Sequence, residues 1–228
     1  MVREACGTID DVIARMRAID AELPAEDGVA QFNRLYLRVT EEVLAAVVTA
    51  SFEDAAFLDR LDVVFAGLYF AAYDADAAGE TVPAAWRPLF AHRHRAHRMP
   101  LQFAMAGMNA HINHDLPFAV VSTCAEMGLT PSDGSPQHRD YQAVNRLLGE
   151  VEVRVKAAYL SGAMKALDLH AGHIDDAWAM GGIHLARSAA WHRALRLWTL
   201  RRHPKLYEEY LRVMAAEVDL AGRALVAL

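Results

Sequence analysis

Residues 99–117, MPLQFAMAGMNAHINHDLP, decide how this chain is expected to fold. From Met99 to His114 the segment contains no Asp, Glu, Lys or Arg. A helix that is apolar on nearly all sides is normally surrounded by other helices. The same helix carries a cluster of histidine, asparagine and aspartate side chains, and such groups are costly to bury unless they find partners or perform chemistry. The segment therefore predicts a buried central helix and the best candidate for a functional site.

The central helix is expected to begin at Pro100, since proline suits the first turn of a helix, and to end near Gly128. Pro117 interrupts it. Proline has no backbone N–H and its ring clashes with the carbonyl group four residues earlier, here that of Asn113. We therefore expect a kink that frees backbone groups beside the polar cluster.

Amphipathic helical patterns lie on both sides of this segment. Three helices are predicted before it, each after a capping residue: Thr8, Asp27 and Asp54. A short helix follows Pro83, and further helices are predicted over 138–160, 174–200 and from Pro204 onward. The pattern predicts an all-α fold, a single domain over residues 1–228 with about eight packed, mostly antiparallel helices around the buried central one.

Composition excludes several classes of function. The net charge is −6 and there is no basic stripe, so we expect no nucleic-acid partner. The two cysteines are too few for a disulfide framework. Asp10 and Asp11 stand where a signal peptide would be apolar, and the uncharged run Val63–Tyr73 is too short to span a bilayer. We therefore expect a cytoplasmic protein with no membrane span.

The predicted helix over 55–78 contains a notable aspartate, Asp62, which directly precedes the uncharged run. On a helix it shares a face with Tyr69. Asp62 could be a metal ligand, a base or a group that orients a histidine. It could equally be ion-paired with Arg87 or Arg187. A second polar line, Asn33, Tyr36 and Thr40, could line a pocket, but we expect it to face solvent.

The chemistry of the central cluster depends on His111 and Asp115. Four residues apart on a helix, they lie about 40° from each other on one face. Three interpretations remain open. The pair could bind a divalent, zinc-like metal ion, with Asp62 as a further ligand. It could act without metal as a general acid or base. It could also be a structural network of buried hydrogen bonds.

The leading hypothesis is an enzyme that acts on a small, largely apolar organic molecule by non-redox hydrolytic or acid/base chemistry. His111, Asp115 and Asp62 would be its catalytic residues. A metal-free cyclase or isomerase of specialised metabolism is one alternative, and a non-catalytic binding or structural protein is another. The apolar last helix could also support a homodimer. The side chains expected to bind substrate are Asn109, Asn113, Tyr69, His114 and Arg187.

The sequence LQFAMAGMNAHIN over 101–113, followed by DLP over 115–117, resembles the signature of a bacterial family of uncharacterised all-helical proteins. The resemblance extends to 27–36, 60–66 and 83–89, and more loosely to 186–198. It therefore covers most of the chain. It implies an all-helical fold and the position of a site, but no activity.

The central helix also shows a fainter similarity to the helix of zinc-dependent phospholipase C and the related single-strand nucleases. That similarity implies that His111 and Asp115 are zinc ligands and that Asp62 is the aspartate of an earlier helix. The sequence departs from the pattern because Pro117 comes too soon and residues 119–123 contain no histidine. The amino-terminal tryptophan ligand of that group is also missing. A reduced site or a metal-free descendant is what the comparison implies.

Overall fold

Helices make up all the regular secondary structure in the part of the chain that the computed structural model describes, residues 6–47, 51–95, 99–148 and 181–227. The predicted all-α class is confirmed. The elements in chain order are α1 (Ile9–Glu22), α2 (Gly28–Val47), α3 (Ala55–Ala77), η1 (Ala84–Trp86), α4 (Arg87–His92), α5 (Pro100–Ala110), η2 (His111–Asp115), α6 (Leu116–Glu126), a helix over 136–148, α9 (Gly181–Leu200) and α10 (Pro204–Ala227).

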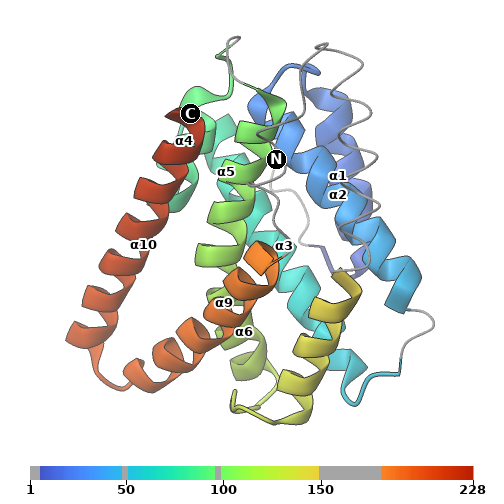
Figure 1. Ribbon diagram of the computed structural model, residues 1–228, viewed down its shortest axis with the longest axis vertical. Helices are drawn as coiled ribbons and strands as arrows, with labels where there is room; N and C mark the ends of the chain where they lie inside the picture. Colours follow the sequence, from blue (N-terminus) through green and yellow to red (C-terminus); the bar gives the residue numbers. More distant parts are fainter. Residues whose placement is uncertain (1–5, 48–50, 96–98, 149–180, 228) are drawn as a thin grey trace.

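The predicted central helix is present as the continuous run α5–η2–α6 (Figure 1). α5 packs against α2 and α10, whereas α6 packs against α3 and α9. One cluster of buried apolar side chains draws on α1 through α6, the helix over 136–148, α9 and α10. The described helices therefore share one core, and the polar cluster of the sequence lies on the helix that the others surround.

A π-helical turn, η2, interrupts the regular α-helix just before Pro117, where the sequence predicted a kink. Within it the amide of Leu116 donates to the carbonyl of His111, five residues earlier. The carbonyl of Asn113 has no amide to accept from at Pro117, and Nη1 of Arg193 on α9 donates to it instead at 2.7 Å. A side chain of the neighbouring helix α9 therefore stabilises the wide turn. Such turns inside α-helices frequently occur at functional sites.

The predicted capping residues occupy the expected places. Thr8 and Asp54 are the N-cap residues of α1 and α3, where their side chains accept from backbone amides. Asp27 accepts from the amide of Val29 at the start of α2. The predicted helices over 138–160 and 174–200 are described only in part, and His170 and His173 lie outside the described residues.

α2 and α5 approach each other closely beside the polar cluster. A Cβ atom at Gly107 would lie 2.4 Å from the ring of Phe32, so only glycine allows this approach. The contact places the first turns of α2 directly against the central helix. Phe32 and Tyr36 of α2 consequently reach the residues of η2.

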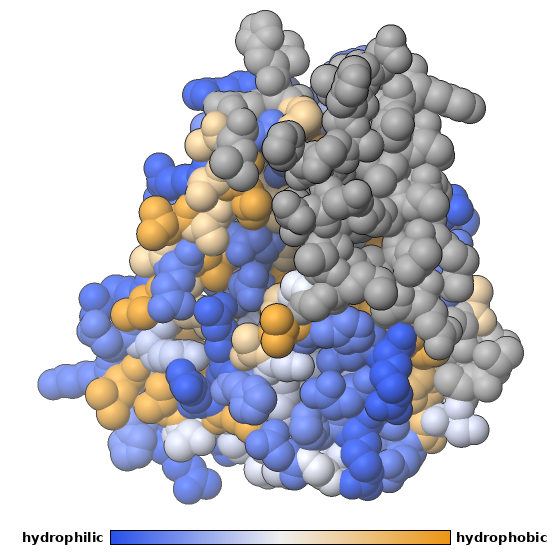
Figure 2. Space-filling model, viewed as in Figure 1, coloured by the Kyte–Doolittle hydropathy of each residue, from blue (hydrophilic) through white to orange (hydrophobic). Residues whose placement is uncertain are grey.

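α10 carries an exposed line of apolar residues, Leu206, Val213 and Leu220, spaced seven residues apart. On the visible face, apolar side chains alternate with polar ones along the α10 side (Figure 2). A homodimer through this helix stays a prediction. Among the described helices, none combines the length and the apolar character needed to cross a membrane.

Candidate functional site

His111 lies inside a shell of aromatic side chains. It is 1% exposed, and its ring stacks on that of Phe65 of α3 with a centroid distance of 3.5 Å and an interplanar angle of 6°. Tyr36 of α2 meets the imidazole at 64° and 4.5 Å. Three more aromatic rings lie within about 6 Å of the imidazole, those of Phe32, Tyr69 and Trp86. Residues from α2, α3 and η1 thus enclose one histidine of the central helix.

Asp115 accepts hydrogen bonds from three rings. Nδ1 of His111 lies 3.3 Å from Oδ2, and the indole Nε1 of Trp86 donates to the same oxygen at 3.0 Å. Nδ1 of His114 lies 2.8 Å from Oδ1. Since an ionised carboxylate only accepts, both histidines present an Nδ1–H to it. The structure therefore brings His111 and Asp115 together as their spacing predicts, and adds Trp86 from outside the helix.

These contacts set the protonation of the pair. Burial by itself raises the pKa of the Asp115 carboxyl, but the hydrogen bonds and charges of His111 and His114 outweigh it and hold that pKa below its ordinary value. Burial lowers the pKa of His111 more than Asp115 raises it. His111 is therefore a neutral imidazole at neutral pH. Its Nε2 carries a lone pair and is buried without a hydrogen-bond partner in the part of the chain that the structure describes.

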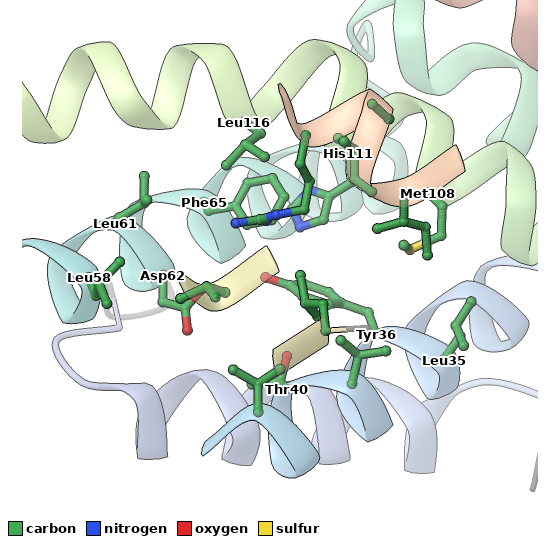
Figure 3. A pocket seen from close by; sticks show the side chains of 18 of the residues that line it. Leu35, Tyr36, Thr40, Leu58, Leu61, Asp62, Phe65, Met108, His111 and Leu116 are labelled. Carbon is green, nitrogen blue, oxygen red and sulfur yellow. The ribbon is translucent and has the colours of Figure 1, made fainter. Parts of the chain in front are cut away.

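A cavity of about 340 Å³ lies beside His111, bordered by residues of α2, α3, α5, η2 and α9 (Figure 3). This volume falls within the range of small-molecule sites, roughly 300–1,000 Å³. Its wall is mostly apolar, with side chains such as Leu35, Val39, Leu58, Phe65, Met108 and Leu116. The cavity therefore suits a small molecule that is itself largely apolar.

Asp62 of α3 lines this cavity and is partly buried. Within the described ranges, no residue forms a hydrogen bond or ion pair with its carboxylate, so the predicted pairing with Arg87 or Arg187 is not found there. Burial raises the pKa of Asp62 to about 6, against a weaker lowering by the charge of Arg187. Figure 3 shows Asp62, Tyr36 and Thr40 around the same space. Asp62 is thus a carboxyl group that can change its charge near neutral pH.

Arg187 of α9 also lines the cavity and is only 8% exposed. Its Nε donates to Oδ1 of Asn145, and its guanidinium lies 4.6 Å from the ring centroid of Tyr141. No described Asp or Glu side chain is close enough to Arg187 to form an ion pair. The cavity wall therefore contains both a buried cation, Arg187, and the carboxyl group of Asp62, which do not form an ion pair.

Of the other residues predicted to bind substrate, Asn109 and Asn113 border the cavity, whereas Tyr69 and His114 do not. Asn109 and Asn113 border the cavity, but the amide of Asn109 donates to the carbonyl of Val218 and that of Asn113 donates to Asn109. The hydroxyl of Tyr69 donates to Asn33 in the core, and His114 is bound to Asp115. Neither Tyr69 nor His114 is among the residues that line the cavity.

The predicted metal-ligand set is not assembled in the described ranges, where no group of three His, Cys, Asp or Glu side chains is close enough together to hold an ion. The two oxygens of Asp115 accept from Trp86, His111 and His114. Asp62 lines the cavity together with His111, whereas Asp115 is not among its lining residues. The three predicted ligands therefore do not form one metal-binding group.

The prediction that Asn33, Tyr36 and Thr40 face solvent is wrong. Their exposed fractions are 0%, 8% and 7%, because α2 is covered on this side as well as along its apolar stripe. Tyr36 and Thr40 line the cavity. The aromatic ring of Tyr36 could have indicated that this line is buried, since large aromatic side chains rarely lie on a fully solvated helix face.

Comparison with known proteins identifies the family to which the sequence is similar. The sequence model of DUF5995, described as a family of unknown function, matches residues 9–228. No curated protein and no solved structure matches the chain. The match supports the family resemblance seen in the sequence, whereas the chemistry of the site has to be inferred from its own residues.

Proposed function

The chain belongs to the DUF5995 family, whose description assigns no activity, and from the site itself we propose an enzyme that binds a small, largely apolar organic molecule and acts on it by non-redox acid/base chemistry. The observation that carries this proposal is the carboxyl group of Asp62, which faces a mostly apolar cavity without a partner among the described residues. Apolar pockets with a few convergent polar groups and a perturbed pKa are the usual form of small-molecule sites.

Asp62 is proposed as the proton-transfer group. With a pKa raised to about 6 by burial, it is present in both protonation states close to neutral pH and can accept or donate a proton. Its carboxyl group is the one that a bound molecule meets directly. The hydroxyl of Tyr36, which has its own pKa raised well above the ordinary value by burial, stays protonated beside it as a hydrogen-bond donor.

His111 and Asp115 are proposed as a supporting pair. Asp115 fixes the Nδ1–H tautomer of the imidazole, so that Nε2 is the basic atom. That nitrogen is covered by the aromatic shell, which makes His111 less directly accessible to a ligand than Asp62. A purely structural role for the pair has its own support, because two of the three donors to Asp115, Trp86 and His111, are themselves buried in the core.

Binding is tested with the neutral fluorescent probe N-phenyl-1-naphthylamine. We expect the purified protein to bind the probe and Leu58→Trp, which places a larger ring in the cavity wall, to bind it at least about 10-fold more weakly. Leu206→Trp is the matched control, since Leu206 is exposed on α10 and is not among the residues that line the cavity. Equal binding by the two variants would place the probe outside the cavity and refute the assignment of the site.

Chemistry is tested by deuterium exchange of small apolar ketones in D₂O, followed by NMR. We expect exchange next to the carbonyl group that Asp62→Asn slows about 100-fold, the scale of general acid/base catalysis. Glu80→Gln also removes one negative charge, but at an exposed position, and therefore controls for the change in net charge. If the protein binds the probe but wild type and Asp62→Asn exchange deuterium at identical rates, the protein binds small molecules without acting on them, and the proposed enzyme activity is refuted.

A further inference from the structure

Arg187 is the most unusual charged group of the cavity. A guanidinium that is more than nine-tenths buried is normally paired with a carboxylate, because removing a charge from water is costly unless an opposite charge compensates. Here its described hydrogen-bond partner is the neutral amide of Asn145, and its described ring contact is Tyr141. The buried positive charge is therefore compensated only weakly by the described residues.

Asp62 does not supply the missing anion. It lines the same cavity, but it forms no ion pair with Arg187, whose charge reaches it only as a weaker, longer-range effect. Both groups therefore face the same cavity without pairing with each other. Tyr36 and Thr40 add hydroxyl groups to this wall, and the remaining wall is mostly apolar.

The geometry favours one class of anion. A planar guanidinium matches the two oxygens of a carboxylate, to which it can donate two parallel hydrogen bonds. A phosphate dianion is disfavoured, since Arg187 is the only Lys or Arg among the described residues that line the cavity, and Asp59 and Asp62 are both present. An ammonium group would meet the permanent charge of Arg187.

From these contacts we propose that the ligand of the cavity is a monocarboxylate with an apolar body, whose carboxylate binds Arg187 and whose body packs on the apolar wall. The inference rests on the proposed function, in which the cavity holds a small apolar molecule, and it names the chemical class of that molecule. Asp62 then lies beside the bound carboxylate as the nearby acid/base group.

The test compares octanoate with octan-1-ol, which have the same chain length and differ in the head group. Binding is measured by displacement of N-phenyl-1-naphthylamine. We expect wild type to bind octanoate at least about 10-fold more tightly than octan-1-ol, since a charge-assisted hydrogen bond is one of the stronger polar contacts. Octanoate bound no more tightly than the alcohol would overturn the inference.

Arg187→Gln is expected to lose at least about 10-fold in octanoate binding and less than about 2-fold in octan-1-ol binding. Arg196→Gln, an exposed position on the same helix, is the matched control and should change neither. Retained alcohol binding shows that the variant is folded. An equal loss of both ligands in a folded Arg187→Gln protein would contradict the proposed contact.

Asp62→Asn provides a second, independent measurement if Arg187→Gln fails to fold. Removing the negative charge from the wall should strengthen octanoate binding about 3-fold or more, and should change octan-1-ol binding by a smaller factor, because the alcohol carries no charge. Unchanged octanoate binding would overturn the placement of the carboxylate. The proposed function fails by a different result, namely that neither the probe nor octan-1-ol binds. If both bind but octanoate binds no more tightly than the alcohol, only the monocarboxylate inference is refuted.

Discussion

Asp62 and Asp115 are the same residue type in opposite surroundings. Asp115 is enclosed by three ring donors, and those contacts hold its pKa below the ordinary value despite burial. Asp62 faces a cavity without such donors, and burial raises its pKa to about 6. Environment alone therefore separates a carboxylate that is ionised at neutral pH from a carboxyl group suited to proton transfer.

Asp62→Asn should stabilise the protein at neutral pH. Because the pKa of Asp62 is raised in the folded state, that state keeps a proton which the unfolded chain loses between about pH 4 and pH 6, and wild-type stability falls as pH rises through this window. Asp62→Asn has no ionisable group at this position, so its stability does not fall in this way between pH 4 and pH 6. We expect its free energy of unfolding in urea to exceed that of wild type by about 1–3 kcal/mol at pH 7.5, and by much less at pH 4.

The surface variant Glu80→Gln serves as the control for this measurement, because Glu80 is exposed. It should change the free energy of unfolding by less than about 0.5 kcal/mol at either pH. A gain for Asp62→Asn that was equal at pH 4 and pH 7.5 would show that the charge of Asp62 is not its source.

At the scale of elements, the π-turn η2 determines how the central helix presents its polar residues. Pro117 removes one donor from the helix, and the carbonyl of Asn113 receives its hydrogen bond from Arg193 of α9. The turn thereby couples the central helix to α9, the helix that also contributes Arg187 to the cavity. A local defect in one helix is thus compensated by a contact from another.

A double-mutant cycle tests this compensation. Arg193→Met should lower the free energy of unfolding by about 1–2 kcal/mol, because it leaves the carbonyl of Asn113 without that donor. In a Pro117→Ala background the loss should be smaller by about 1 kcal/mol, since the new backbone N–H can donate to Asn113. The separate contact between Arg193 and Glu217 cancels in the cycle. Additive effects of the two substitutions would contradict the compensation.

At the scale of the whole molecule, Arg93 joins three parts of the helical bundle. It follows α4, its Nε donates to Asp27 at the start of α2 at 2.8 Å, and its Nη1 donates to Asp76 of α3 at 2.6 Å. Asp27 is almost entirely buried. The carbonyl of Arg93 also accepts from the amide of Gly28. These contacts hold α2, α3 and α4 around the aromatic shell of His111.

Arg93→Gln should therefore destabilise the protein strongly, by about 3–5 kcal/mol, since it removes the guanidinium paired with the buried carboxylate of Asp27 and leaves it the amide of Val29 and the ring of His94 as neighbours. The matched control is Arg212→Gln, which breaks an ion pair with Glu209 whose two side chains are 73% and 60% exposed. Such exposed pairs contribute less than about 1 kcal/mol. Similar losses for the two variants in urea unfolding would show that Arg93 does not hold the helices together.

Features that depend on residues close together in the chain could be predicted from the amino-acid sequence. Caps such as Thr8 and Asp54 were predictable, because each side chain accepts from an amide within its own first turn. The contact between His111 and Asp115 follows from their spacing on one helix. The interruption at Pro117 was also predictable, because proline lacks the N–H that an α-helix needs.

What covers each helical face depends on how the helices pack, and the amino-acid sequence could not predict it. Trp86 lies 29 residues from Asp115 along the chain, and nothing in local periodicity indicates that its indole donates to that carboxylate. The cavity takes Tyr36, Asp62 and Arg187 from three separate helices, and the predicted solvent-facing line of α2 is buried against it. Periodicity places a residue on a face of a helix, whereas burial, pKa and partners depend on which other helix packs there.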